Sequence, residues 1–87
     1  MTNQALTADT ITDKQIRALR TEAAQAGDEA QVKLCDLALT YDANYEEWLH
    51  ERQPHKRPAA WEDVERAHRA KHKCAQAINT ARAMEDA

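Results

Sequence analysis

Apolar residues recur along this chain at intervals of three and four, the spacing that places them on one face of an α-helix. The first stretch begins at Thr12, where Gln15 stands three residues on to complete a capping box. The apolar stripe that follows is Ile16, Leu19, Ala23 and Ala26. Gly27, the only glycine, then takes the left-handed conformation that ends a helix without strain. This pattern predicts a helix over about residues 13–26.

A second helical pattern follows at once. Asp28 is a suitable N-cap, with Gln31 three residues later. The apolar and aromatic positions that continue in helical phase are Leu34, Leu37, Ala38, Tyr41, Tyr45 and Trp48. Asp42 and Asn44 are residues that can cap a new turn, but the unbroken phase favours one element. We therefore expect a helix over about residues 29–52 with a kink near residues 42–44.

Two prolines mark the next connection and the third helix. Pro54 pushes the residue before it out of helical geometry, and Pro58 suits a first helical turn. From about residue 59 to 85 the inward positions are mostly small: Val64, Ala67, Ala70, Cys74, Ala77, Ile78 and Ala81. Short connections make neighbouring helices antiparallel. The prediction is an all-α, three-helix antiparallel bundle forming one domain over residues 10–87, with residues 1–9 frayed.

The composition indicates a thin core. Of the 87 residues, 43% are hydrophobic, but 18 are alanines and only 11 are Leu, Ile or Val, with no Phe. At about 25 cal/mol per Å² of buried apolar area, so few large side chains barely offset the chain entropy lost on folding. We therefore expect the chain either to form a homo-oligomer, most simply a homodimer, or to dock on a larger protein.

Several classes of protein are not indicated. The first ten residues lack the basic start and apolar run of a signal peptide, and no apolar run reaches membrane length. Two cysteines do not make a secreted disulfide framework, so we expect a cytoplasmic protein with no membrane partner. The sequence has no phosphate-binding glycine loop and no nucleophile motif. We expect no enzyme and no cofactor.

Charge is distributed unevenly along the chain. Residues 52–73 hold seven Lys or Arg against three acidic residues, a net charge of +4, whereas residues 1–51 carry −6. Such asymmetry suggests oriented association with a charged partner. The alternative is that the acidic second helix pairs with the basic start of the third, which is common on surfaces without a function. Both interpretations stay open from the sequence.

Nucleic acid is an alternative partner for the basic stretch. The turn at Gly27–Asp28 has helix-turn-helix spacing, but its second helix begins with two acidic residues that phosphates would repel. The recognition-helix interpretation is therefore rejected. The basic face of residues 52–73, with Trp48 and Trp61 nearby, leaves a regulator that binds nucleic acid non-specifically as a second hypothesis.

A zinc-stabilised module is a third hypothesis. His68 and His72 stand four residues apart on the third helix, the spacing of two zinc ligands on one helix face. Cys74 points to the opposite side, toward the apolar stripe, and Cys35 lies on the core face of its helix. Two buried thiols and two solvent-facing histidines are favoured over a metal site. A disulfide between the cysteines is geometrically open but disfavoured in the cytoplasm.

The aromatic residues concentrate at one end of the predicted bundle. Tyr41, Tyr45 and Trp48 share a helix face, and Trp61 opens the third helix. We expect Trp48 to pack against Trp61 across the proline turn. Trp, Tyr and Arg are also the residues enriched in binding hot spots. The predicted partner-binding residues are Tyr45, Trp48, Arg52, Lys56, Arg57, Trp61, Arg66 and Arg69.

The stretch 12-TDKQIRALRTEAAQAGDEAQVKLCDLAL-39 resembles a motif of small uncharacterised proteins of phages, prophages and mobile elements, and 73-KCAQAINTARA-83 is similar to the Cys-containing helix that closes them. The resemblance covers about half the chain, and residues from Thr40 to about Arg66 depart from it as an insertion. It implies a compact helical hairpin and no known activity. The function expected is a non-enzymatic accessory protein that binds, and inhibits, a host protein, with anti-restriction or anti-CRISPR activity as instances.

Overall fold

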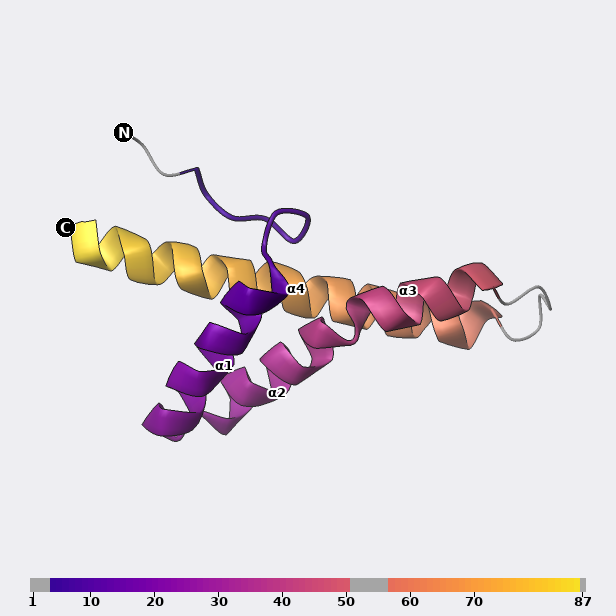
Figure 1. The fold of residues 1–87 in the computed structure, drawn as a ribbon, viewed down its shortest axis with the longest axis horizontal. Helices are drawn as coiled ribbons and strands as arrows, with labels where there is room; N and C mark the ends of the chain where they lie inside the picture. Colours follow the sequence, from indigo (N-terminus) through magenta and orange to yellow (C-terminus); the bar gives the residue numbers. More distant parts are fainter. Residues whose placement is uncertain (1–3, 51–56, 87) are drawn as a thin grey trace.

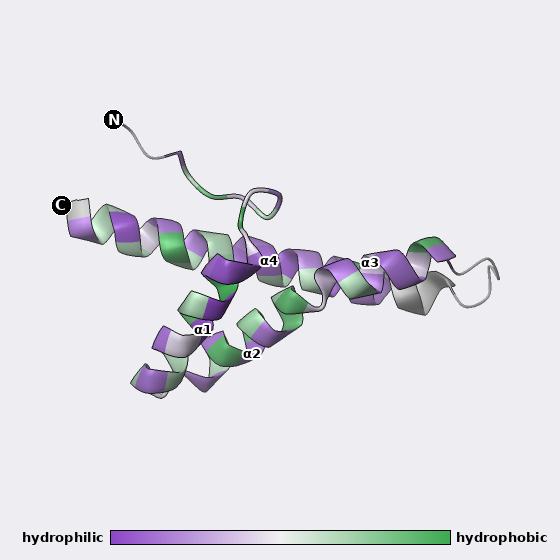
Figure 2. Cartoon of the chain, viewed as in Figure 1, coloured by the Kyte–Doolittle hydropathy of each residue, from purple (hydrophilic) through white to green (hydrophobic). Residues whose placement is uncertain are grey.

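The computed structural model describes residues 4–50 and 57–86, and all regular secondary structure in those ranges is helical. Four helices follow one another in the chain (Figure 1): α1 (Asp13–Ala26), α2 (Glu29–Leu39), α3 (Tyr41–His50) and α4 (Arg57–Asp86). The predicted all-α class is confirmed. None of the described helices is long and apolar enough to cross a membrane, and Figure 2 shows polar and apolar residues alternating along each of them.

Helix α1 begins and ends where the local sequence predicts. The Thr12 side chain accepts a hydrogen bond from the Gln15 N–H at 3.1 Å, and the Gln15 side chain accepts one from the Thr12 N–H at 2.9 Å. At the other end Gly27 has φ 75°, and the Asp28 N–H donates to the Ala23 carbonyl at 2.8 Å. Caps at both ends are satisfied by neighbouring residues, so α1 needs no tertiary contact to set its length.

The second predicted helix is divided into two at Thr40, and the expected kink near residues 42–44 is placed too late. The Thr40 Oγ donates to the Leu37 carbonyl at 2.6 Å, which closes α2. The same Oγ accepts from the Asn44 side-chain amide at 3.1 Å, within the first turn of α3. A threonine hydroxyl competes with backbone hydrogen bonds in this way and interrupts helices without a glycine or proline. The predicted end at residue 52 lies outside the described residues.

The break at Thr40 sends α2 and α3 in different directions. α3 runs beside the first part of α4, whereas the hairpin of α1 and α2 meets α4 further along and projects obliquely away from it (Figure 1). The molecule is accordingly long and thin, with extents of 51 × 31 × 17 Å. The predicted antiparallel three-helix bundle is not confirmed, because α1 and α2 do not lie along α4. α4 is close to the predicted third helix, starting two residues earlier and ending one later.

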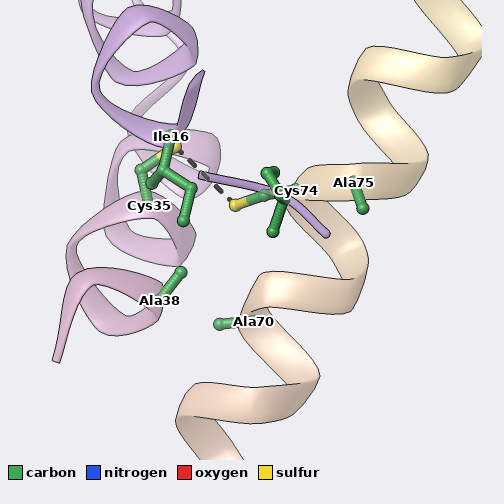
Figure 3. Packing of buried hydrophobic residues seen from close by; sticks show 7 residues of the cluster. Ile16, Cys35, Ala38, Ala70, Cys74 and Ala75 are labelled. Atoms are coloured by element: carbon green, nitrogen blue, oxygen red, sulfur yellow. Dashed lines mark hydrogen bonds between the residues drawn. The ribbon is translucent and has the colours of Figure 1, made fainter. Parts of the chain in front are cut away.

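The core lies where the α1–α2 hairpin meets α4. Its largest fully buried side chains are Ile16, Cys35 and Cys74 (Figure 3). The remaining buried hydrophobic residues are Ala8, Ile11, Ala23, Ala38, Val64, Ala67, Ala70 and Ala75. No polar or charged side chain is buried among the described residues. Alanines let the helix backbones approach closely, but each contributes little apolar area, so the core is small for the length of the chain.

The N-terminal segment is bound to α4, contrary to the expectation that residues 1–9 fray. The Leu6 N–H donates to Asn79 Oδ1 and the Asn79 side-chain amide donates to the Leu6 carbonyl, both at 2.8 Å. Ala8 is buried, and Leu6 packs against the core. Residues 1–3 lie outside the described part of the chain. The anchor at Asn79 is 73 residues distant in sequence, so no local pattern signals it.

Candidate partner-docking site

Four aromatic rings form a continuous row that crosses from α3 to α4. Tyr41, Tyr45 and Trp48 are spaced four and three residues apart, which places them on one face of α3. Their ring centroids are 6.0 Å apart for Tyr41–Tyr45 and 5.9 Å apart for Tyr45–Trp48. The row continues to Trp61 of α4, whose ring centroid lies 4.8 Å from that of Trp48. We call Tyr41, Tyr45, Trp48 and Trp61 the aromatic row.

The predicted contact between Trp48 and Trp61 is confirmed. Their rings are tilted at 48°, within the range of favourable aromatic pairs. The contact does not hide the row from solvent, because Tyr45 is 39% exposed and Trp61 is 40% exposed. Leu49 of α3 is exposed as well. The rings therefore both hold α3 against α4 and present apolar area to the outside.

The Tyr41 end of the row is enclosed by charged and titratable groups of α4. The His68 ring centroid lies 5.7 Å from that of Tyr41, and Lys71 Nζ lies 4.7 Å from the centre of the Tyr41 ring. An ammonium over an aromatic face is a favourable cation–π contact. Burial, with smaller effects of Tyr45, Asp9 and Asp42, raises the pKa of Tyr41, so the phenol stays protonated at neutral pH. Tyr41 thus anchors α3 against α4 through its contacts with His68 and Lys71.

A shallow groove on the α4 side reaches both ends of the row, Tyr41 and Trp61. It has a volume of about 380 Å³, and it is lined by Tyr41, Trp61, Val64, Glu65, His68 and Arg69. The Trp61 indole N–H donates to Glu65 at 3.0 Å, one helical turn along, which fixes the orientation of the ring. The floor is apolar and the rim carries one carboxylate, one imidazole and one guanidinium. This combination of an apolar pocket and a few polar groups is typical of a recognition surface.

The structure brings together part of the predicted site. Tyr45, Trp48 and Trp61 lie in one row, and Arg69 lines the groove beside them. Arg66 is exposed three residues before Arg69 on the same helix. Arg52 and Lys56 lie outside the described residues, and Arg57 is placed only as the first residue of α4. The sequence did not predict that His68, Lys71 and Glu65 belong to this surface, although the four-residue spacing of Trp61 and Glu65 could have indicated their contact.

The charges of α4 are not neutralised by α2 or α3 in the part of the molecule that the structure describes. The described side chains form the ion pair Arg20–Asp36, which joins α1 to α2, and a contact of His68 with Asp9, whose Nε2 and Oδ1 are 3.9 Å apart. No pair between described side chains links α2 or α3 to α4. The alternative in which acidic and basic helices pair across the surface is therefore not seen among these residues. Arg66 and Arg69 remain available to an acidic partner.

The histidines of the zinc hypothesis have other neighbours. His68 lies against Tyr41 and near Asp9, and His72 is exposed. Within residues 4–50 and 57–86, no three His, Cys, Asp or Glu side chains gather as metal ligands would. Cys74 faces Cys35, with the two sulfurs 3.8 Å apart. A zinc site built on His68 and His72 thus finds no third ligand in this part of the chain.

Comparison of the chain with protein-family models, with curated proteins and with solved structures gives no match. The resemblance to proteins of phages and mobile elements stays a prediction from the sequence.

Proposed function

We propose that this protein is a non-enzymatic interaction module that docks on another protein through the aromatic row and the groove beside it. The observation that supports the proposal is the exposure of Tyr45 and Trp61 in a row already fixed by ring contacts. Aromatic rings held in place lose little conformational freedom on binding, and partly exposed Tyr and Trp are the residues most enriched in binding hot spots. The surface is preorganised for a partner.

The groove favours an amphipathic helix with acidic residues on its flank. Its apolar floor accepts the buried face of such a helix, and Arg69, with Arg66 nearby, supplies positive charge at the rim. A partner helix in this position would lie against α3 and α4. Together with α3 and α4, this partner helix would form the antiparallel three-helix packing that the sequence predicts for the chain.

The biological setting that we propose rests on the sequence resemblance. A small accessory protein of a phage or mobile element, acting in the cytoplasm, would use such a surface to bind and inhibit a host protein. Anti-restriction and anti-CRISPR activity are instances of this role. A second copy of the chain is the other occupant to consider, since the small core supports self-association. Light scattering on the purified protein separates a homodimer from a monomer that awaits a host partner.

Truncating one ring of the row tests the proposal. Trp61→Ala should weaken partner binding by at least about tenfold, because removing a hot-spot aromatic costs about 2 kcal/mol or more. Binding is measured by affinity capture from host lysate with quantitative mass spectrometry, and helicity by circular dichroism. Met84→Ala is the matched control, since Met84 is 74% exposed near the far end of α4. Equal capture by both variants and by the native chain would refute the docking site.

Binding to nucleic acid is a second candidate, supported by basic residues of α4 that begin at the groove and continue along the helix. Arg66, Arg69 and Lys73 are exposed and spaced three and four residues apart, so they form one basic stripe. Phosphate contacts of this kind weaken steeply with salt. A titration of salt against duplex and single-stranded DNA decides between the candidates: steep loss of binding supports nucleic acid, and no binding at low salt removes it.

A further inference from the structure

The core contains a pair of cysteines that the docking surface does not use. Cys35 of α2 and Cys74 of α4 are both fully buried, and their sulfurs lie 3.8 Å apart across the helix interface (Figure 3). The side-chain amide of Gln31 lies 3.5 Å from the Cys35 sulfur and 3.6 Å from the Cys74 sulfur. Both cysteines are free thiols in this structure. The pair joins the α1–α2 hairpin to the long helix at the point where the core is most buried.

We propose that Cys35 and Cys74 are a redox-modification site, at which a small-molecule disulfide such as oxidised glutathione converts the two thiols into one intramolecular disulfide. The sulfurs need to approach by about 2 Å to reach the length of a disulfide bond. Ala38 and Ala70, which flank the pair in the same core, are small and leave the two helices close together. The link would tie α2 to α4 covalently.

The reaction proceeds by two thiol–disulfide exchanges. The thiolate of one cysteine attacks a sulfur of oxidised glutathione, forming a mixed disulfide and releasing one glutathione thiolate, which takes up a proton. The thiolate of the other cysteine then attacks the protein sulfur of the mixed disulfide and releases the second glutathione. Overall, two protein thiols and one oxidised glutathione give one protein disulfide and two reduced glutathiones. Two electrons pass from the cysteines to glutathione.

The folded state keeps oxidised glutathione away from the two cysteines. Neither sulfur is exposed, so glutathione reaches them only after α2 separates from α4. Burial, together with the neighbouring Cys35 thiol, raises the pKa of Cys74 to about 12, so little of the reactive thiolate is present in the closed fold. The Gln31 amide, which donates to both sulfurs, offsets only part of this effect. Oxidation therefore takes place in the opened chain, and closure then shields the product from reductants.

The test uses the full-length chain incubated with oxidised glutathione, with and without enough urea to open the fold. In urea, followed by refolding, the native protein should lose about 2 Da, resist alkylation and melt roughly 10–20 °C higher than its reduced form. Without urea the reaction should be at least about tenfold slower. Cys35→Ala and Cys74→Ala are matched controls: each should retain one glutathione and show no such rise in melting temperature.

Three outcomes would overturn the assignment. The native chain would end as stable glutathione adducts, it would form intermolecular dimers at low protein concentration, or it would form the internal disulfide without any gain in melting temperature. The first two would show that the sulfurs do not meet in the refolded chain. The third would show that the bond strains the contact between α2 and α4.

Discussion

Replacing Ile16 by alanine should lower the free energy of unfolding by about 2–5 kcal/mol, the usual cost of truncating a fully buried isoleucine. Ile16 has no exposed surface and is the largest of the fully buried side chains, in the cluster that also contains Cys35 and Cys74. At about 0.05–0.15 kcal/mol per residue, a chain of this length has only about 4–13 kcal/mol of stability in total. The substitution should thus remove a large share of the stability of the protein and lower its melting temperature.

Urea unfolding followed by circular dichroism measures this loss. Met84→Ala is again the control, because a mostly exposed side chain contributes within about 0.5 kcal/mol. If Ile16→Ala and Met84→Ala unfolded at the same urea concentration, the core would not lie where α1 and α2 meet α4.

Enlarging Ala70 should destabilise the protein by a different mechanism. Ala70 is 1% exposed, and it belongs to the same buried cluster as Ala38 of α2 (Figure 3). A leucine at this position must either adopt a strained rotamer or push α2 away from α4, at a cost of about 1–3 kcal/mol. We expect the variant Ala70→Leu to have a lower urea midpoint and faster amide exchange in α2.

Ala83→Leu provides the matched control for that substitution. Ala83 is exposed on the same helix, so the added side chain should change stability by less than about 0.5 kcal/mol. A comparable loss in both variants would point to a general effect on α4. It would contradict the close approach of α2 and α4.

The sequence predicts the elements whose limits are set by their own neighbours. Thr12 with Gln15, and Gly27 at the other end, fix α1 within one turn of each cap, and both limits agree with the structure. The sequence places the break two to four residues too late, because the role of Thr40 at this break becomes evident only from its contact with Asn44. The position of this break matters for the overall shape, because the turn at Thr40 directs α1 and α2 away from the axis of α4.

In the candidate site, too, the sequence predicts contacts between residues that are close in the chain, but it does not predict those that depend on how the helices pack. The spacing of Tyr41, Tyr45 and Trp48 predicts one aromatic face, and the chain reversal before α4 predicts the contact of Trp48 with Trp61. The contacts of His68 and Lys71 with Tyr41 depend on the register of α3 along α4, which no periodicity determines. The sequence also does not predict the two hydrogen bonds between Leu6 and Asn79, because they depend on where the N-terminal segment lies along α4.

The most direct test of the central claim is quantitative affinity capture with two charge-reversed chains. In one, Arg66→Glu and Arg69→Glu reverse the charge beside the aromatic row. In the other, Lys14→Glu and Arg17→Glu make the same change in net charge on the exposed face of α1. Nuclease treatment of the lysate removes capture through nucleic acid. We predict that the proteins bound by the native chain are lost from the first variant and retained by the second. Retention by both variants, or equal loss from both, would contradict a docking surface at the aromatic row.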